Sequence, residues 1–271
     1  MYGRYAYIRK KMAEISAEGD APDLLPPANE EDARTSASEA RKPPLISLAM
    51  LKSAIDKKGI SSLDVNGLSR AAYEGVLLKD EKQGQASSTK DGKQGKPYTR
   101  KYWVHKELNK NCWMVLAKAL SISWGDDSRY WQWPEEEEPC YPDKEEVHVA
   151  ELIKVCCLEI KGEFNTIRLS PWTTYEVKIL VKMRPKSSGW EHPVNLNLAL
   201  PDGTKQGRTE NLGILEKEKW FPISIGKFET TPKTIGKMSF SLAQTDGNRK
   251  KGLCVKAIRL MPTTGENEPP R

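Results

Sequence analysis

Residues 123–133, SWGDDSRYWQW, combine three tryptophans, a tyrosine, an arginine and two adjacent aspartates. A pyranose ring presents a face of C–H groups and an edge of hydroxyl groups, so a site for it needs a flat aromatic side chain and a few charged or amide groups. The segment supplies both kinds of side chain within a short stretch. It is therefore a candidate carbohydrate-binding surface.

The local pattern places these side chains on a turn between two strands. LSISW is typical of a strand, GDDS of a tight turn and RYWQW of a second strand, in which Trp131 and Trp133 share one face. A second interpretation stays open, in which Asp126 or Asp127 caps the turn and pairs with Arg129 while the tryptophans pack in the core. Large aromatic side chains are usually mostly buried, and we expect Trp133 in particular to fill the core.

Outside this segment the sequence contains no motif for catalysis or metal binding. The glutamates of PEEEEP, Glu135–Glu138, could be imagined as catalytic carboxylates, but contiguous like charges normally stay in water, so we interpret them as a solvated acidic loop. His105, His148 and His192 lack the spacing of a zinc site or of a Ser-His-Asp arrangement. We therefore expect a protein without enzymatic activity, metal or cofactor.

The C-terminal part of the chain consists of short strand-like runs separated by turns, such as PVNLNLAL, WFPISIGKF and KMSFSLAQT. In VNLNLAL the Val and Leu side chains at 194, 196 and 198 fall on one face and the two intervening asparagines on the other. Such alternation is expected of a sheet with one buried and one solvated face. The pattern predicts an all-β domain, an antiparallel β-sandwich.

The N-terminal part changes composition along the chain. Residues 17–44 are rich in Pro, Ala, Ser and acidic residues and bury too little apolar area to offset ordering. Apolar residues then recur at three- and four-residue intervals on both sides of Gly59, which predicts two short amphipathic helices, and a Lys-, Gly- and Gln-rich tract follows. The predicted organisation is a disordered extension (1–44), a short helical segment (45–78), a basic flexible linker (79–101), the β-sandwich (102–262) and a disordered tail (263–271).

Charge and hydropathy limit the partners. The formal charge is +6, and the sequence contains neither an apolar run long enough to span a membrane nor a secretory signal pattern. We expect a cytoplasmic protein with no membrane partner. The lysines of the linker and the cluster RKK at 249–251 are expected to be solubilising charge, with RNA contact or nuclear import as the alternative.

The five cysteines are odd in number and form no C-x-x-C pair, which argues against a disulfide framework and a structural zinc site. Cys140 lies in a polar loop and is expected to be the most exposed thiol. Cys156 and Cys157 are adjacent in a predicted strand, so their side chains are expected on opposite faces and cannot pair with each other.

Several segments resemble, in order and with similar spacing, the phloem protein 2 family of plant lectins, which includes the tobacco agglutinin. The resemblance covers about residues 101–262 and is carried by KYWVHKELNKNCWMVLAKALSISWGDDSRYWQW, VAELIKVCCLEIKGEF, LSPWTTYEVKILVKM, GWEHPVNLNLALPDG, IGKFETTP, IGKMSFSL and KKGLCVKAIRLMP. It implies a β-sandwich of the jelly-roll type that binds chitin-like oligomers of N-acetylglucosamine and the cores of N-glycans. It also implies a stress-related or defence protein of the plant cytoplasm, nucleus or phloem sap, and intermolecular disulfides, for which we expect Cys140 to link a homodimer.

The resemblance also suggests residues for the site. In this family two tryptophans seven positions apart are associated with carbohydrate binding, and they correspond to Trp124 and Trp131. Asp127, Arg129 and Tyr130 are the nearest candidates for hydrogen bonds to hydroxyl or acetamido groups, because charged partners form the stronger bonds.

One position departs from the family pattern. After the strand MSFSL the family tends to have an acidic residue, whereas this chain has Gln244, followed by a slightly shorter loop without the usual aromatic. Gln244 can still donate and accept hydrogen bonds to a sugar. Because of the lost charge we also consider an RNA-binding or scaffolding phloem protein with reduced sugar binding, for which steeply salt-dependent RNA binding would be the signature.

Overall fold

A computed structural model of the chain describes residues 43–44, 47, 51, 64–79 and 96–264. All of these residues belong to one compact unit, Lys42–Arg271. Most of the predicted disordered extension, of the first predicted helix, of the linker and of the C-terminal tail lies outside the described residues. Their boundaries therefore stay predictions.

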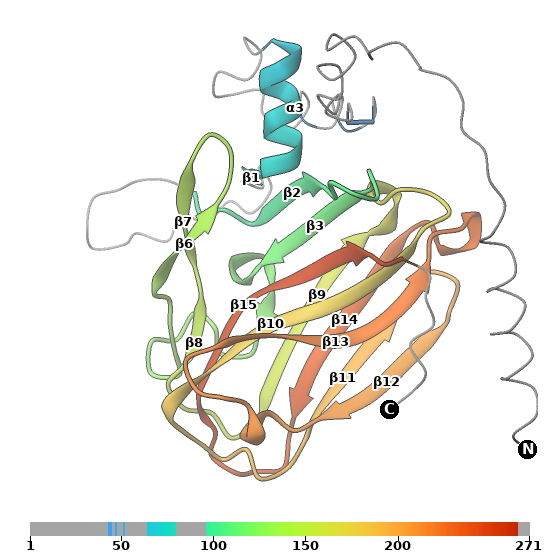
Figure 1. Ribbon diagram of the computed structural model, residues 1–271. Helices are drawn as coiled ribbons and strands as arrows, with labels where there is room; N and C mark the ends of the chain where they lie inside the picture. The colour runs from blue at the N-terminus through green and yellow to red at the C-terminus, as the bar shows by residue number, and fades with distance from the viewer. Residues whose placement is uncertain (1–42, 45–46, 48–50, 52–63, 80–95, 265–271) are drawn as a thin grey trace, which may run out of the picture. The chain divides into compact units, whose positions relative to one another are not determined.

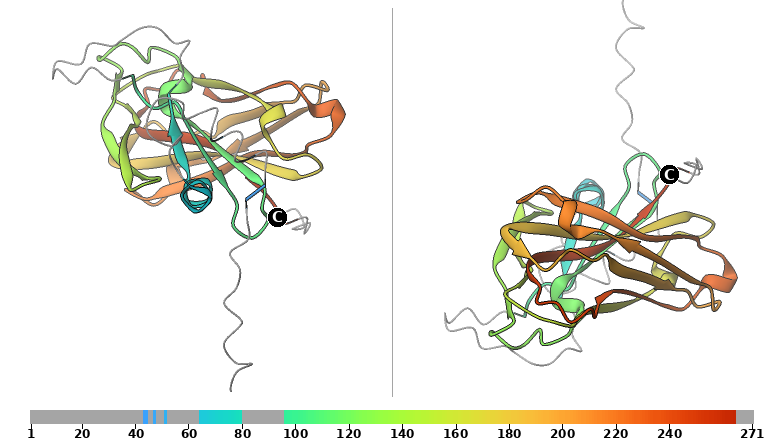
Figure 2. Two further views of the ribbon diagram at one scale, coloured as in Figure 1. Left: turned by 90° about the horizontal axis from the view of Figure 1, so that it is seen from above. Right: turned by 90° about the horizontal axis from the view of Figure 1, so that it is seen from below.

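The described part of the chain forms a sandwich of an eight-stranded and a five-stranded sheet, whose layers can be followed in Figure 1 and from above and below in Figure 2. The larger sheet contains, in spatial order, β1 (Val76–Leu78), β2 (Arg100–Val104), β3 (Asn111–Leu116), β15 (Lys251–Pro262), β10 (Thr174–Ser188) and β13 (Trp220–Glu229), with β8 (Ala150–Leu152) beside β15 and β5 (Trp131–Gln132) beside β8. The smaller sheet contains β12 (Lys205–Glu210), β11 (Val194–Ala199), β14 (Lys237–Gln244), β9 (Leu158–Asn165) and β4 (Ser121–Ile122).

The remaining elements are short. Strands β6 (Glu135–Pro139) and β7 (Lys144–His148) form a separate hairpin. The 3₁₀ turns are η3 (Ala117–Ala119), η4 (Thr166–Arg168), η5 (Leu212–Ile214) and η6 (Pro232–Thr234). All pairings between the named strands are antiparallel. The predicted antiparallel β-sandwich of the jelly-roll type is confirmed.

The inward-facing side chains of both sheets form one core. On β11, Val194, Leu196 and Leu198 are 0% exposed while the asparagines between them are exposed, as the alternation predicts. From the other sheet, Val177 and Val181 of β10 are equally buried and belong to the same cluster. Burying one such side chain contributes about 1.5–3 kcal/mol, so this facing arrangement holds the two layers together.

Helix α3 (Val65–Glu74) confirms the second predicted helix. It begins at Asp64, whose carboxylate accepts a hydrogen bond from the Gly67 amide at 2.7 Å, and it buries Leu68 and two alanines in the core. It ends at Gly75, because that residue has φ +91°, which side chains with a Cβ rarely adopt. Val76, which was predicted as part of the helical segment, instead begins β1, which pairs with β2.

The boundary predicted at residue 102 also needs correction. Arg100 and Lys101, assigned to the linker, are the first residues of β2 and pair with Val115 and Met114 of β3. The lysine and arginine made this stretch look like linker in the sequence. In the structure the long side chain of Lys101 is buried to 8% exposure because a carboxylate receives its ammonium group.

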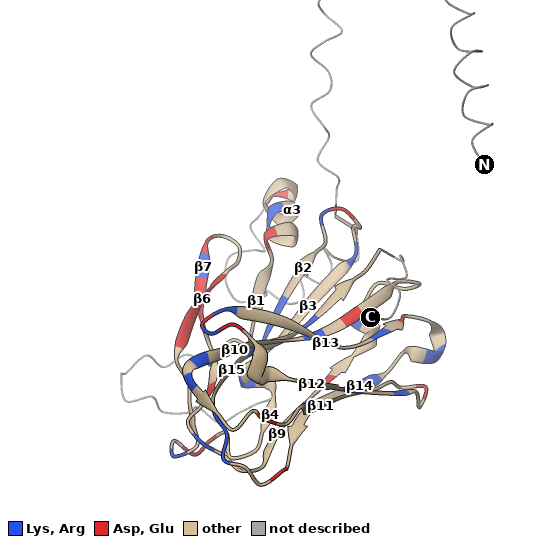
Figure 3. Ribbon diagram, turned by 60° about the horizontal axis from the view of Figure 1, so that its bottom comes forward, with Lys and Arg blue, Asp and Glu red and all other residues tan. Residues whose placement is uncertain are grey.

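The run Glu135–Glu138 is a strand and not a solvated loop. Along β6 the side chains alternate, so that Glu136 and Glu138 are more buried than their neighbours, and Figure 3 shows the acidic residues along this strand. Glu138 is 6% exposed and pairs with Lys101 and Lys256, each at 2.7 Å. The interpretation as a water-exposed acidic run holds for Glu135 and Glu137, which are exposed. It is wrong for Glu138, because the two lysines that neutralise it lie far away in the sequence.

Two of the cysteine predictions were wrong, although all five thiols are free and Cys156 and Cys157 do not pair. Cys140 is 4% exposed, since the amide of the next residue, Tyr141, bonds to the Gly75 carbonyl at 2.7 Å and holds the tip of the hairpin against the end of α3. Cys156 and Cys157 are exposed free thiols, and they lie between β8 and β9 rather than within a strand. The pattern VCCLEI suggested one continuous strand, but the chain bends there.

Candidate functional site

The loop between β4 and β5 presents Trp124 to solvent. Its indole is 62% exposed, and its backbone has φ +64°, the left-handed region that favours glycine. A bulky residue held there costs about 1–3 kcal/mol, and such positions cluster at functional sites. Exposure of the indole also forgoes the stabilisation that burial of an aromatic side chain would give. Trp124 is therefore placed at a cost in stability, which points to a role at the surface.

Two further tryptophans form hydrogen bonds to the backbone of this loop. The indole N–H of Trp131 donates to the Ser123 carbonyl and that of Trp133 to the Gly125 carbonyl, each at 3.0 Å. These two carbonyls lie on either side of Trp124. The spacing of the three tryptophans thus has a structural reason, because Trp131 and Trp133 fix the backbone that carries the exposed Trp124.

The structure corrects the prediction that Trp131 forms an accessible binding surface. Trp131 is 1% exposed and belongs to the main core. Strand β5 pairs with β8, with Trp131 opposite Leu152, and this pairing turns the indole inward. Trp133 is half-buried and packs against the core, with the Lys118 ammonium 3.6 Å from its ring. Burial lowers the pKa of Lys118, with Asp126 opposing that shift.

Beside Trp124 lie the polar side chains expected from the sequence. Tyr130 is in ring contact with Trp124, with centroids 5.7 Å apart and planes inclined by 45°. The Arg129 guanidinium lies 5.5 Å from the Tyr130 ring and donates to both carboxylate oxygens of Asp127. Bonds from the side chain and the backbone of Arg129 hold the pKa of Asp127 below its ordinary value, so this carboxylate is ionised at neutral pH. Trp124, Tyr130, Arg129 and Asp127 form one surface, which we call the Trp124 surface.

A shallow depression adjoins this surface. It has a volume of about 570 Å³ and is lined by Ile122, Trp124 and residues 125–128. The capping interpretation of the aspartates holds in part, because Asp127 does accept from the Arg129 amide at 2.9 Å and from its side chain. The turn and the exposed indole coexist, so turn capping does not exclude a binding role.

Gln244 lies at the same end of the smaller sheet but is not accessible. It pairs with Leu158 of β9, and the other neighbour of β9 is β4, which leads to Trp124. Gln244 is 3% exposed, and its amide donates to the carbonyls of His192 and Pro193. Its side-chain oxygen is buried without a partner among the described residues. Gln244 is therefore not accessible to a ligand in this structure, and its hydrogen bonds position the neighbouring loop.

Lys250 is a residue whose role the sequence reasoning missed. It was grouped with the solubilising cluster 249–251, but it is 0% exposed. Its ammonium donates to the carbonyls of Cys156 and Asn248, each at 2.9 Å, and pairs with Asp246. This buried cation ties together two loops at the end of the sandwich that carries Trp124. The only sequence signal was an aspartate four residues before the lysine.

Within the described ranges, no group of three or more His, Cys, Asp or Glu side chains has the arrangement of a metal site. In the same ranges no helix has the length and apolar composition to cross a membrane.

Two antiparallel layers and a loop that presents an exposed indole beside charged side chains define a β-sandwich protein with an aromatic surface site. The chain belongs to the phloem protein 2 family, whose model matches residues 110–262. The protein named phloem protein 2-like A1 of Arabidopsis thaliana is 36% identical over 218 residues, which cover 79% of each chain. A protein named lectin from Luffa acutangula is 39% identical over 165 residues, covering 60% of this chain and 77% of that protein.

Among solved structures, the CBM22-1 xylan-binding domain of Paenibacillus barcinonensis Xyn10C is 12% identical, with a TM-score of 0.31 over 55% of this chain and 88% of that domain. A likeness of this degree carries no statement about function.

Proposed function

We propose that this protein is a lectin that binds oligosaccharides through the Trp124 surface. The observation that carries the proposal is the exposed indole of Trp124, held on a left-handed backbone by two tryptophans beneath it. A folded protein gains no stability from such an arrangement, whereas a sugar ring gains a flat apolar face to stack on. Relatives from Luffa acutangula and Coccinia grandis that carry the name lectin support this assignment.

The finer specificity is for oligomers of N-acetylglucosamine and the cores of N-glycans. In this mode one pyranose ring stacks on Trp124 while Tyr130 flanks it. Arg129 donates to hydroxyl or acetamido oxygens, and Asp127 accepts from hydroxyl or amide hydrogens. The depression is shallow, so a single sugar ring makes few contacts. Affinity should therefore rise with oligomer length and with clustering of glycans. On family grounds we place the protein in phloem sap.

RNA binding is the alternative, and it depends on free basic side chains. Of the cluster 249–251, Lys250 is buried and paired, so this cluster offers fewer cations to a phosphate backbone than its sequence suggests. Glycan binding and RNA binding, each measured at two salt concentrations, separate the two functions. RNA binding should weaken steeply as the salt concentration rises, whereas binding of a neutral glycan should change little.

The decisive test compares two matched tryptophans. Trp172 is 68% exposed with φ +50°, close to the values of Trp124, but it lies in the loop between η4 and β10. We expect Trp124→Ala to weaken binding of chitotriose by about 5- to 150-fold in calorimetry, as lost aromatic stacking of about 1–3 kcal/mol implies. Trp172→Ala should bind as the wild type does. Equal affinity of both variants and the wild type would remove the Trp124 surface from sugar binding.

A further inference from the structure

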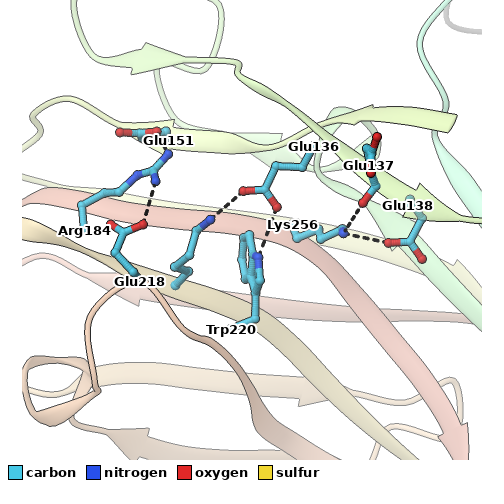
Figure 4. A network of polar contacts seen from close by, with 9 residues as sticks. Glu136, Glu137, Glu138, Glu151, Arg184, Glu218, Trp220 and Lys256 are labelled. Carbon is cyan, nitrogen blue, oxygen red and sulfur yellow. Dashed lines mark hydrogen bonds and ion pairs between the residues drawn. The ribbon is translucent and has the colours of Figure 1, made fainter. Parts of the chain in front are cut away.

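A second concave site lies on the outer face of the larger sheet, away from the core. It is a groove of about 460 Å³ between α3, strand β6 and the outer face of β2, β3, β15, β10 and β13, and we call it the sheet-face groove. Figure 4 shows how the glutamates of β6 approach the lysines and Trp220 of the sheet. None of the residues of the Trp124 surface lines this groove.

Strand register brings the side chains of the groove together. Lys101 of β2 and Arg259 of β15 both lie opposite Met114 of β3, so the three form one row across the sheet. Trp103 follows two residues after Lys101 and therefore points to the same face. The Arg259 guanidinium lies 5.7 Å from the Trp103 ring.

Most of the cations in the groove already have an anionic partner. Lys101 and Lys256 share Glu138, each at 2.7 Å. Next to the groove, Lys182 pairs at 2.6 Å with Glu136, which also accepts the indole N–H of the groove residue Trp220 at 3.2 Å. These lysines are therefore neutralised by the hairpin, and their donors are directed to it.

Arg259 differs from these lysines. Within the described ranges its guanidinium has no carboxylate within ion-pair distance, and its only hydrogen bond is a weak one to the Met261 sulfur at 3.8 Å. Its Nε atom is buried without a partner. A half-buried guanidinium without an anion is costly, and its planar fork matches a carboxylate in a two-pronged hydrogen bond.

The other walls of the groove decide what kind of carboxylate fits. Trp103 and Pro222 provide exposed apolar surface, while Met114 and Leu180 lie beneath them at 4% and 8% exposure. The polar groups apart from Arg259 are largely engaged, including Glu74, which pairs with Arg70. A neutral sugar would bury several hydroxyl groups here without partners, and each unsatisfied hydroxyl costs about 1–3 kcal/mol. A ligand with one carboxylate flanked by apolar groups satisfies both Arg259 and the apolar wall.

We propose that the sheet-face groove binds a peptide segment of a partner protein in which one acidic residue is flanked by apolar residues. Trp103 on β2 lies beside Arg259, whereas Trp220 on β13 lies four inter-strand steps away and about six residues further along the strands. An extended peptide of about six residues, or roughly 20 Å, therefore covers the part of the groove around Arg259 and Trp103. The acidic side chain binds Arg259, and apolar side chains contact Trp103 and Pro222.

The test uses the full chain and two blocked peptides, acetyl-Leu-Ser-Glu-Leu-Leu-Ser-amide and the same peptide with Gln in place of Glu. Binding is measured by calorimetry and by the indole N–H signals in NMR spectra. We expect the Glu peptide to bind at least about tenfold more tightly than the Gln peptide and to shift the indole signal of Trp103, which lies beside Arg259. Arg259→Gln should reduce the affinity for the Glu peptide to that for the Gln peptide.

Two controls separate this site from other effects. Arg208→Gln removes an arginine from β12 of the other sheet, where it pairs with Glu210, and should leave peptide binding unchanged. Trp124→Ala should also leave it unchanged, even if sugar binding is lost, so the two proposals fail independently. Equal affinity of the Glu and Gln peptides for the wild type would overturn the proposal. A shift of the Trp103 and Trp220 signals by chitotriose would make the groove a sugar site instead.

Discussion

Replacing Trp131 by alanine should cost stability rather than remove a sugar contact. Its indole is 1% exposed in the core and donates to the Ser123 carbonyl at 3.0 Å. Loss of a buried Trp side chain costs about 3–5 kcal/mol, and loss of the hydrogen bond adds about 1 kcal/mol. The expected change of about 4–6 kcal/mol is a large part of the 5–15 kcal/mol typical of a folded domain. For a domain of this size it lowers Tm by about 10–20 °C.

The measurement is urea unfolding followed by circular dichroism, with chitotriose binding measured separately at a temperature where the variant is folded. Trp131→Phe is the matched control, since it keeps a buried aromatic ring but loses the N–H donor and part of the ring volume. We expect it to lose about 1–2 kcal/mol. Trp124→Gly provides the opposite case. It should keep or raise stability, because glycine tolerates the left-handed backbone at φ +64°, and it should lose sugar affinity.

The reasoning is refuted if Trp131→Ala unfolds at the wild-type urea concentration and yet no longer binds chitotriose. That result would mean that the indole contacts the ligand directly. It would also mean that the pairing of β5 with β8, which turns Trp131 inward, does not persist in solution.

Two further predictions concern buried polar groups. Glu138→Gln should cost about 3–5 kcal/mol at pH 7, because it leaves two largely buried lysines without their shared anion. Burial opposes ionisation of Glu138, but its lysine bonds outweigh burial and lower its pKa, so this stabilisation is complete above about pH 4.3 and is lost as the pH falls through the lowered pKa. Urea midpoints of wild type and variant should therefore converge in acid, and a constant difference down to pH 2 would contradict this. In mass-spectrometric thiol labelling, Cys156 and Cys157 should react before Cys140, because burial raises the pKa of Cys140 to about 11. Earlier labelling of Cys140 would show that the hairpin tip opens.

Local patterns in the sequence were enough to predict much of the fold. The alternation in β11 correctly assigned its buried and exposed faces, because successive strand residues point to opposite sides whatever the partner strand is. The helical period of α3 could also be predicted, because it depends on residues three and four positions apart. Its end at Gly75 depends on the backbone angle of that residue. The Asp127–Arg129 pair is also local, since only one residue separates the two side chains.

The choice between core and surface at the site could not be made from the sequence. Trp124 and Trp131 have the same side chain and lie on adjacent parts of one segment, yet one is 62% exposed and the other 1%. Spacing relates Trp131 to Trp133, but only the pairing of β5 with β8 decides which way their shared face points. Gln244 likewise lies at the end of the sheet that carries Trp124, as the sequence suggested. Its burial depends on the loop that contains His192, whose carbonyl accepts a hydrogen bond from the Gln244 amide.

The sequence by itself determined the strands, their two faces, the second helix and the segment that carries the exposed indole, because each depends on periodicity or on neighbours a few residues apart. Only the tertiary structure decided which charged side chains are buried and which of them have a counter-charge. Glu138 is buried because Lys101 and Lys256 reach it from two other strands. Lys250 is buried because carbonyls of two loops surround its ammonium group. Arg259 has no counter-charge because no carboxylate of the described residues lies within ion-pair distance. A charged side chain is exposed or buried according to whether a counter-charge lies nearby, and that partner is brought by the packing of strands distant in sequence.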